Sequence, residues 1–108
     1  MKNQVFLTDD AVQDLEGLYD YIEYHDAPEK ADYVLGKIEK AFSSLSENPE
    51  RGTYPKEILA VGLREYREIY FKPYRIIYQL IADHVYVMVI ADGRRNIQTL
   101  LQRRLLQA

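Results

Sequence analysis

The amino-acid sequence predicts a single α+β domain, in which an N-terminal strand and a hairpin of two helices precede an antiparallel sheet and a short final helix. Two observations predict this fold class. Apolar residues recur with a helical period before Pro49, whereas after Leu63 the chain is rich in Val, Ile, Tyr and Phe and is divided by turn signals. Helices that need a sheet to cover their apolar faces are typical of such domains. The 108 residues suffice for one core, so we expect one domain spanning residues 1–108 and a sheet of about four strands.

The N-terminal segment predicts a short strand followed by a helix. Residues 4–7 form an apolar run that is too short to stand alone, so we expect this strand to join the sheet. Thr8 is a good N-cap, and the two aspartates that follow it suit the positive end of a helix dipole. Apolar positions at helical spacing across residues 11–22 then predict an amphipathic helix that ends near Asp26.

A second helix and a loop are predicted before the sheet. Pro28 suits a first helical turn, and an apolar stripe runs across residues 31–45. This helix ends before Pro49, because the residue that precedes a proline is pushed away from helical geometry. Residues 47–57 carry two prolines and a glycine, and we expect them to form a loop.

Residues 63–95 predict three strands in an antiparallel meander. The first turn lies at Lys72-Pro73, where proline fixes φ and removes a ladder donor, and the second lies at residues 82–84. After this meander, residues 96–106 place four apolar side chains on one face and two arginines near their end. They predict a shorter third helix whose cationic end complements its dipole.

The charge is distributed unevenly along the chain. Residues 1–62 contain 6 Lys/Arg and 13 Asp/Glu, whereas residues 63–108 contain 8 Lys/Arg and 4 Asp/Glu. The C-terminal part alone therefore suits an anionic partner. The alternative interpretation is that helix surfaces are simply acidic and strands carry arginine, and charge alone does not choose between the two.

Several kinds of site are missing from the sequence. There is no cysteine, which excludes disulfides and thiolate metal sites. The two histidines, His25 and His84, lack metal-ligand spacing, and we expect them to be a helix C-cap and a solvent-exposed turn residue. No glycine-rich phosphate cradle or nucleophile elbow is present, so we expect no metal and no cofactor. No signal peptide or membrane-spanning run is recognisable, which leads us to expect a cytoplasmic protein without a membrane partner.

The candidate functional residues are arginines that interleave with aromatic residues: Arg64, Arg67, Arg75, Arg94 and Arg95. A guanidinium hardly ever loses its proton, so these groups serve to contact or stabilise anionic groups. Buried arginine requires a partner, and we therefore expect most of them to face outward, with Arg75 and Arg94 as the first candidates for contact. The tyrosines beside them are expected to pack, although they also suit base stacking: Tyr66, Tyr70, Tyr74, Tyr78 and Tyr86.

Strand geometry limits two of these arginines. Successive side chains in a strand alternate between faces, so Arg64 and Arg67 cannot share a face unless the strand bulges. We expect at least one of them to be structural and paired with Glu65 or Glu68.

Four segments resemble the RelE/ParE superfamily of bacterial type II toxins in their order and spacing: LTDDAVQDLEGLYDYI, ENPERG, GLREYREIYFKPYRIIY and VYVMVIADGRR. Together they extend over nearly the whole chain. The resemblance implies a compact toxin that is held inactive by an antitoxin encoded beside it. It also implies a homodimer or a toxin–antitoxin hetero-oligomer as the assembly.

Two branches of the superfamily differ in their targets. The RelE branch cleaves mRNA in the ribosome with lysine, arginine and tyrosine side chains on the sheet, and Arg64, Arg75 and Arg94 match basic members of that set. Here, however, no tyrosine follows the last strand, and Lys72 is the only lysine of the meander. The segment ADGRRN and the leucine-rich helix after it are more similar to the ParE branch, whose members poison DNA gyrase without chemistry of their own.

The prediction is therefore a ParE-like toxin that binds DNA gyrase through Arg67, Arg75, Arg94 and Arg95. The alternative is a RelE-like endoribonuclease with the ribosome and mRNA as partners. A third class, a binding module without toxicity, applies if the resemblance is structural only.

Overall fold

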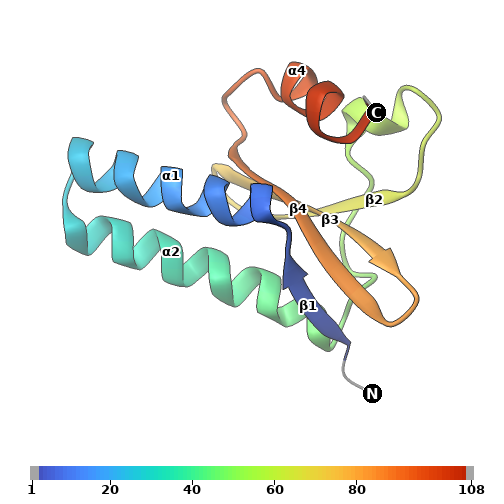
Figure 1. The fold of residues 1–108 in the computed structure, drawn as a ribbon, viewed down its shortest axis with the longest axis horizontal. Helices are drawn as coiled ribbons and strands as arrows, with labels where there is room; N and C mark the ends of the chain where they lie inside the picture. The colour runs from blue at the N-terminus through green and yellow to red at the C-terminus, as the bar shows by residue number, and fades with distance from the viewer. Residues whose placement is uncertain (1–2, 107–108) are drawn as a thin grey trace.

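The computed structural model describes residues 3–106, and its helices and strands follow the predicted order (Figure 1). The elements are β1 Gln4–Leu7, α1 Asp9–His25, α2 Pro28–Ser43, a 3₁₀ turn Ser44–Ser46, α3 Lys56–Leu59, β2 Tyr66–Phe71, β3 Tyr74–Ile81, β4 His84–Asp92, α4 Ile97–Leu101 and a π-helical turn Gln102–Leu106. The α+β fold class is confirmed.

The four strands form one mixed sheet with the order β1-β4-β3-β2. The meander from β2 to β4 is antiparallel, as predicted, but β1 runs parallel to β4, with Gln4 opposite His84 and Leu7 opposite Val87. The antiparallel pairing expected for residues 4–7 was therefore wrong. A parallel pair requires a long crossover connection, and the helix hairpin with the first two meander strands supplies it.

Local capping sets the beginning of α1. The Thr8 hydroxyl oxygen accepts a hydrogen bond from the Ala11 N–H at 3.2 Å, which confirms the predicted N-cap. The same hydroxyl donates to the Val87 carbonyl at 3.2 Å and so ties the start of α1 to β4. Pro28 opens α2 at its first turn, also as predicted.

The C-cap predicted for α1 is corrected. Asp26, not His25, is the C-cap residue, and its N–H donates to the Ile22 carbonyl at 2.8 Å. The His25 ring instead lies 4.2 Å from the Tyr21 ring and 5.0 Å from the Tyr24 ring. Tyr21 stands one helical turn before His25, which brings its ring within reach of the imidazole.

His84 is not the exposed turn residue that we expected. It is the first residue of β4 and is half-buried. Its ring stacks on Phe6 at 5.5 Å and on Tyr86 at 6.2 Å. The pairing of β1 with β4, which no local pattern indicates, brings these rings together.

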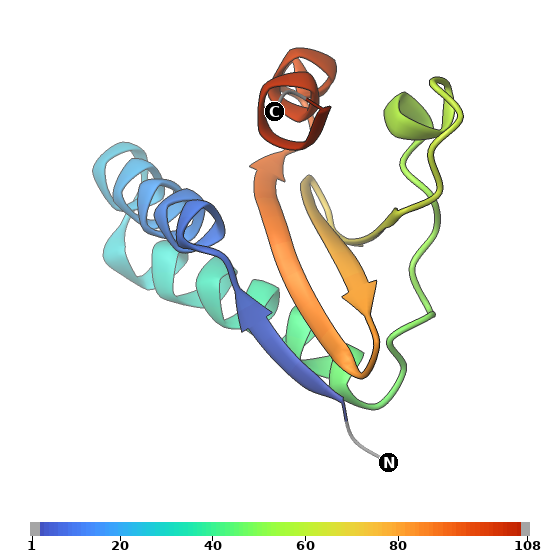
Figure 2. The same cartoon turned by 45° about the vertical axis from the view of Figure 1, so that its right-hand side comes forward.

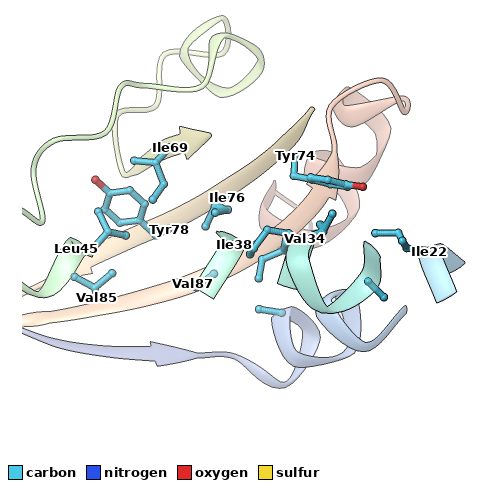
Figure 3. Packing of buried hydrophobic residues seen from close by; sticks show 13 residues of the cluster. Ile22, Val34, Ile38, Leu45, Ile69, Tyr74, Ile76, Tyr78, Val85 and Val87 are labelled. Carbon is cyan, nitrogen blue, oxygen red and sulfur yellow. The ribbon is translucent and has the colours of Figure 1, made fainter. Parts of the chain in front are cut away.

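The sheet has an apolar cluster on each face. On one face, the α1–α2 hairpin buries Val34 and Ile38 against Ile76, Tyr78 and Val87 (Figure 3). On the other face, α3 and α4 cover Ile77, Val89 and Ala91. Figure 2 shows the helix hairpin on one side of β4 and the short helices α3 and α4 away from it.

A bulge in β4 allows this apolar strand to contribute side chains to the clusters on both faces of the sheet. Ile77 pairs with Val89, but its neighbour Tyr78 pairs with Val87, so Met88 is an extra residue in the ladder. An extra residue reverses the side-chain alternation beyond it. Val87 therefore faces the helix hairpin, whereas Val89 faces α4.

The predicted loop and first strand differ in detail from the structure. Residues 56–59 form the short helix α3, and β2 begins at Tyr66, not near Leu63. The reason is non-local: Ile58 is fully buried in the second apolar cluster, so tertiary packing holds a turn of helix where the composition indicates only a loop.

The Tyr78 hydroxyl binds the loop before α3 to the sheet. Tyr78→Phe should therefore lower the free energy of unfolding by about 1–2 kcal/mol. Its buried hydroxyl donates to the Pro49 carbonyl at 2.6 Å and accepts from the Gly52 N–H at 3.0 Å. The variant leaves both backbone groups without this partner. Urea unfolding measures the effect, with the 85% exposed Tyr24→Phe as a control that should be neutral. Equal stability of the two variants would show that other contacts hold the loop.

Candidate functional site

Arg75, on β3, is buried within a network of carboxylates. Only 8% of the residue is exposed. Its Nε donates to Glu68 Oε2 at 2.7 Å, while Nη1 and Nη2 donate to the two oxygens of Glu57 at 2.8 Å each. Such a bidentate, charge-assisted pair is among the strongest side-chain interactions. Arg75 is therefore the exception to the outward orientation predicted for the arginines.

Tyr70 completes this network from β2, where it pairs with Arg75 across the ladder. Its hydroxyl donates to Glu68 Oε1 at 2.5 Å. Burial, and then this hydrogen bond to a carboxylate, raise the pKa of Tyr70 to about 12. The hydrogen bonds to Glu57 in turn raise the pKa of Arg75. Neither group is therefore a base at neutral pH.

A hollow of about 360 Å³ opens above this network, lined by Thr53, Tyr54, Lys56, Glu68, Tyr70, Arg75 and Gly93. Gly93 permits the close approach: a Cβ there would lie 3.1 Å from Arg75 Cδ and 2.9 Å from the Pro73 carbonyl oxygen. An anion that entered this hollow would meet two carboxylates that already hold the Arg75 guanidinium. Contact with Arg75 then requires breaking that pair.

The Arg75–Glu57 pair should make the fold acid-labile. Hydrogen bonds from Arg75 hold the pKa of Glu57 below its ordinary value of 4.5. A carboxyl group whose pKa is lowered in the folded state contributes stability above its unfolded pKa, and that stability is lost as the pH falls through the folded value. We expect the melting temperature to decline below about pH 4.5 and Glu57→Gln to flatten that decline. Identical pH profiles for both proteins would contradict this coupling.

Arg67 holds the loop before α3 through hydrogen bonds to its backbone. Its Nη1 donates to the carbonyls of Glu50 at 3.3 Å and Gly52 at 3.0 Å, and its guanidinium carbon lies 4.8 Å from the Tyr54 ring centroid. Arg64, which precedes β2, lies 5.8 Å from the same ring and is exposed. One of the two arginines is thus structural, as predicted.

The partners differ from those predicted for Arg64 and Arg67. Arg67 bonds to backbone carbonyls, and Glu68 pairs with Arg75. The pairing with Glu65 or Glu68 was therefore wrong, because Arg67 shares a sheet face with Tyr78 while Glu68 shares the opposite face with Arg75.

Arg94 and Arg95 lie on the surface just after β4. The carboxylate of Asp92 accepts from Arg94 Nε at 2.9 Å and Nη2 at 2.6 Å, and the Arg94 side chain is 75% exposed. These hydrogen bonds from Arg94 hold the pKa of Asp92 below its ordinary value. Arg95 is exposed, and within residues 3–106 its side chain makes no hydrogen bond or ion pair. This pair is the part of the predicted site that is open to a partner.

A cleft of about 540 Å³ lies beside the two arginines, and we call it the α1 cleft. Its lining consists of Gln13, Asp14, Gly17, Leu18, Tyr21, Ile90, Asp92, Arg94 and Arg95. The wall thus combines one side of α1 with the end of β4 and the segment after it, which is orange in Figure 1. The structure brings Arg94 and Arg95 into this cleft, whereas the Arg75 guanidinium belongs to the separate carboxylate network.

The sequence interpretation missed Asp14 and Arg104, which brace the cleft. Asp14 Oδ2 accepts from the Ile90 N–H at 3.0 Å, and its Oδ1 pairs with Arg104. Arg104 also donates to the Met88 carbonyl at 3.3 Å. One signal was available: Asp14 stands three residues after Ala11 on the apolar side of a helix, where an acid requires a partner.

The described part of the chain, residues 3–106, contains no group of three or more His, Asp or Glu side chains arranged to hold a metal ion. None of the helices in that range is long and apolar enough to cross a membrane.

Comparisons with solved structures show where this fold occurs. The chromosomal ParDE toxin–antitoxin system from P. aeruginosa contains a similar chain, with a TM-score of 0.71, 19% identity, and coverage of 84% of this chain and 96% of that one. A mutant of the E. coli toxin RelE in the free state gives a TM-score of 0.63 and 16% identity, covering 97% of this chain and all of the other (100%). The toxin–antitoxin complex RelBE2 from Mycobacterium tuberculosis gives 0.56 and 22%, with 85% and 92% covered.

A search of curated proteins finds no match. Residues 5–97 match the family model of the ParE toxin of the type II toxin–antitoxin system parDE. Because this match spans most of the chain and the fold agrees with it, the chain belongs to the ParE toxin family, within the RelE/ParE superfamily of type II toxins.

Proposed function

We propose that this toxin arrests growth by binding and poisoning DNA gyrase, and that it performs no bond-breaking chemistry of its own. One observation carries the proposal: Arg75, the buried cation on the sheet, is committed to Glu57 and Glu68. Stabilising the charge on a reacting phosphate requires donors that are preorganised and available, and these donors already serve two carboxylates.

The other groups near Arg75 support the same proposal. A general base for attack by a ribose hydroxyl needs a pKa near the working pH, and the Tyr70 phenol has a pKa of about 12. Its O–H is also committed to Glu68. The family match to ParE toxins and the similarity to the ParDE structure favour the gyrase branch as well.

We assign target contact to Arg94 and Arg95, because they are exposed beside the α1 cleft. Arg67 and Arg75 contribute indirectly in this proposal. Arg67 holds the loop before α3, and Arg75 joins α3 to the sheet through Glu57.

A cognate antitoxin is the second proposed partner, as in the ParDE and RelBE2 systems. An apolar groove of about 420 Å³, lined by Leu7, Val12, Leu15, Glu16, Tyr19, Asp20 and Leu35, offers it a surface that the toxin does not bury itself. A helix with apolar anchors suits such a groove. The product of an adjacent gene should form a stable complex with the toxin and neutralise it.

Controlled expression in a bacterium that lacks the antitoxin tests the function. We expect growth arrest with induction of a DNA-damage reporter while protein synthesis continues during the first generation. Co-expression of the adjacent gene should restore growth. Immediate translation arrest without the DNA-damage response would reject gyrase as the target.

The alternative function is RelE-like cleavage of mRNA. The observation that favours it is the hollow that gathers Lys56, Tyr54 and Tyr70 above Arg75. For this activity Glu57 and Glu68 must release the guanidinium when RNA binds. Cleavage of ribosome-bound mRNA by the purified wild-type toxin would establish this alternative.

A further inference from the structure

The α1 cleft continues into a second hollow of about 400 Å³, because Tyr21 and Arg94 line both. The second hollow extends from the end of α1 to the β2–β3 turn at Lys72 and Pro73. Together they form one groove, which we call the α1 groove. It is separate from the hollow above Arg75, since the two share no lining residue.

Exposed tyrosines gather at one end of the α1 groove. Tyr21 is 63% exposed, Tyr33 is 57% exposed, and both line the groove. Tyr24, on α1, is 85% exposed, and the His25 ring contacts both Tyr21 and Tyr24. Large aromatic side chains left on the surface in one cluster are typical of protein-binding sites, where tyrosine and arginine dominate the binding energy.

The charges available in the groove are mainly positive. Lys30, Lys72 and Arg95 are exposed, and their side chains make no hydrogen bond or ion pair within residues 3–106. Asp14 and Asp92 also line the groove, but their carboxylates already serve Arg104 and Arg94. Asp26 is the remaining acid of the lining.

We propose that the α1 groove is the docking surface for an acidic segment of the toxin's protein target. The inference rests on the proposed function and adds the face that the toxin uses and the chemistry of the segment it contacts. Lys30, Lys72 and Arg95 supply charge complementarity, and Tyr21 and Tyr33 supply apolar surface with a polar tip.

A protein segment fits better than a nucleic acid. A nucleic-acid backbone presents one phosphate after another and needs a continuous basic track. Here the available cations are three separate side chains, Arg94 is neutralised by Asp92, and Asp26 adds a negative charge to the lining. A protein segment can place its acids beside Lys72 and Arg95 and avoid Asp26.

The target fits this groove better than the antitoxin does. Interfaces between partners that also exist apart are more polar than permanent interfaces, which are more apolar. The groove beside Val12 and Leu35 is mainly apolar, as in a permanent interface, whereas the α1 groove is more polar.

Paired charge reversals test the inference. Lys72→Glu with Arg95→Glu should weaken binding to purified gyrase holoenzyme about 10- to 100-fold and abolish growth arrest. The matched control, Lys40→Glu with Arg103→Glu, makes the same change of charge at exposed residues outside the groove. It should keep both activities. All variants should bind the antitoxin and melt like the wild type, since these side chains make no ion pair within residues 3–106.

Tyr21→Ala provides a second variant that leaves the charge unchanged. It should weaken gyrase binding about tenfold or more, with little loss of stability because the side chain is largely exposed. A photo-crosslinker in place of Tyr21 should react with an acidic segment of gyrase. Crosslinks to nucleic acid or to the antitoxin would overturn the inference.

The failures of the two proposals are distinguishable. If the wild type inhibits gyrase and the reversed pair does so equally, the inference is wrong and the proposed function stands. If the wild type arrests growth without affecting gyrase, the proposed function is wrong. In that case growth arrest tests the inference. If only the Lys72→Glu, Arg95→Glu variant loses toxicity, the inference is supported. If that variant stays fully toxic, or if the control variant also loses toxicity, the inference is wrong.

Discussion

Arg75→Met should lower the free energy of unfolding at neutral pH by about 3–5 kcal/mol, the usual effect of removing one partner of a buried ion pair. The substitution keeps most of the volume of the side chain but leaves the buried Glu68 and the half-buried Glu57 close together. The loss is mainly the cost of two carboxylates without their cation. Chemical denaturation at pH 7 measures it.

The pH dependence identifies the cause of that loss. In the wild type, the lowered pKa of Glu57 gives stability that is present above its unfolded pKa and lost as the pH falls. In Arg75→Met, the lowering of the Glu57 pKa by Arg75 is gone, and burial beside a second carboxylate should raise that pKa instead, so this contribution to stability should be present below the unfolded pKa of Glu57 and lost as the pH rises. The two proteins should therefore converge in stability on acidification.

An exposed arginine–carboxylate pair provides the control. Arg94→Met breaks the pair with Asp92, but the Arg94 side chain is 75% exposed, so the melting temperature should barely change. Equal losses in Arg94→Met and Arg75→Met, or a difference that persists at acid pH, would contradict the structural role of the Arg75 network.

Gly52→Ala should lower the free energy of unfolding by about 3 kcal/mol, the upper end of the usual cost of overpacking. A Cβ at this position would lie 2.6 Å from the Tyr78 hydroxyl and 2.8 Å from the Glu68 carbonyl oxygen. That carbonyl accepts from the Thr53 N–H at 3.0 Å, so the clash falls on backbone that is already bonded. Relief requires the loop to leave β2.

Gly36 offers a matched control for Gly52. It lies on α2, and a Cβ there would meet no atom within 4 Å beyond its chain neighbours and the backbone of its own helix. Gly36→Ala should raise stability by about 0.5–1 kcal/mol, because alanine loses less backbone freedom in a helix than glycine. Thermal melts of both variants compare the two effects, and a neutral Gly52→Ala would show that the loop is not packed against Tyr78 and β2 as described.

Much of the fold was predictable because it depends on local patterns. Apolar spacing defined both long helices, Thr8 and Pro28 marked where they begin, and the turns at Lys72-Pro73 and at residues 82–83 separated the strands. The four segments that resemble the RelE/ParE superfamily identified the family correctly.

The features that were missed are non-local. The parallel pairing of β1 with β4 joins residues about eighty positions apart, and no strand pattern specifies its direction. The bulge at Met88 could not be predicted from the sequence either, since an unbroken apolar run contains no alternation of apolar and polar residues that would indicate it.

The candidate site was predictable only in part for the same reason. The arginine residues were recognisable as candidates, and Arg94 and Arg95 are exposed as expected. What separates them from Arg75 is Glu57, which arrives on α3 from a segment predicted to be a loop. Whether an arginine is free to bind a partner depends on which acids the fold brings to it, and Glu57 and Arg75 are eighteen positions apart in the sequence.

The most direct test of the proposed function combines purified toxin with gyrase and relaxed plasmid, and in parallel with translating ribosomes and mRNA. We predict that supercoiling is inhibited and cleaved gyrase–DNA complexes accumulate, while the ribosome-bound mRNA stays intact. Cleavage of that mRNA by toxin that leaves gyrase unaffected would contradict the proposal.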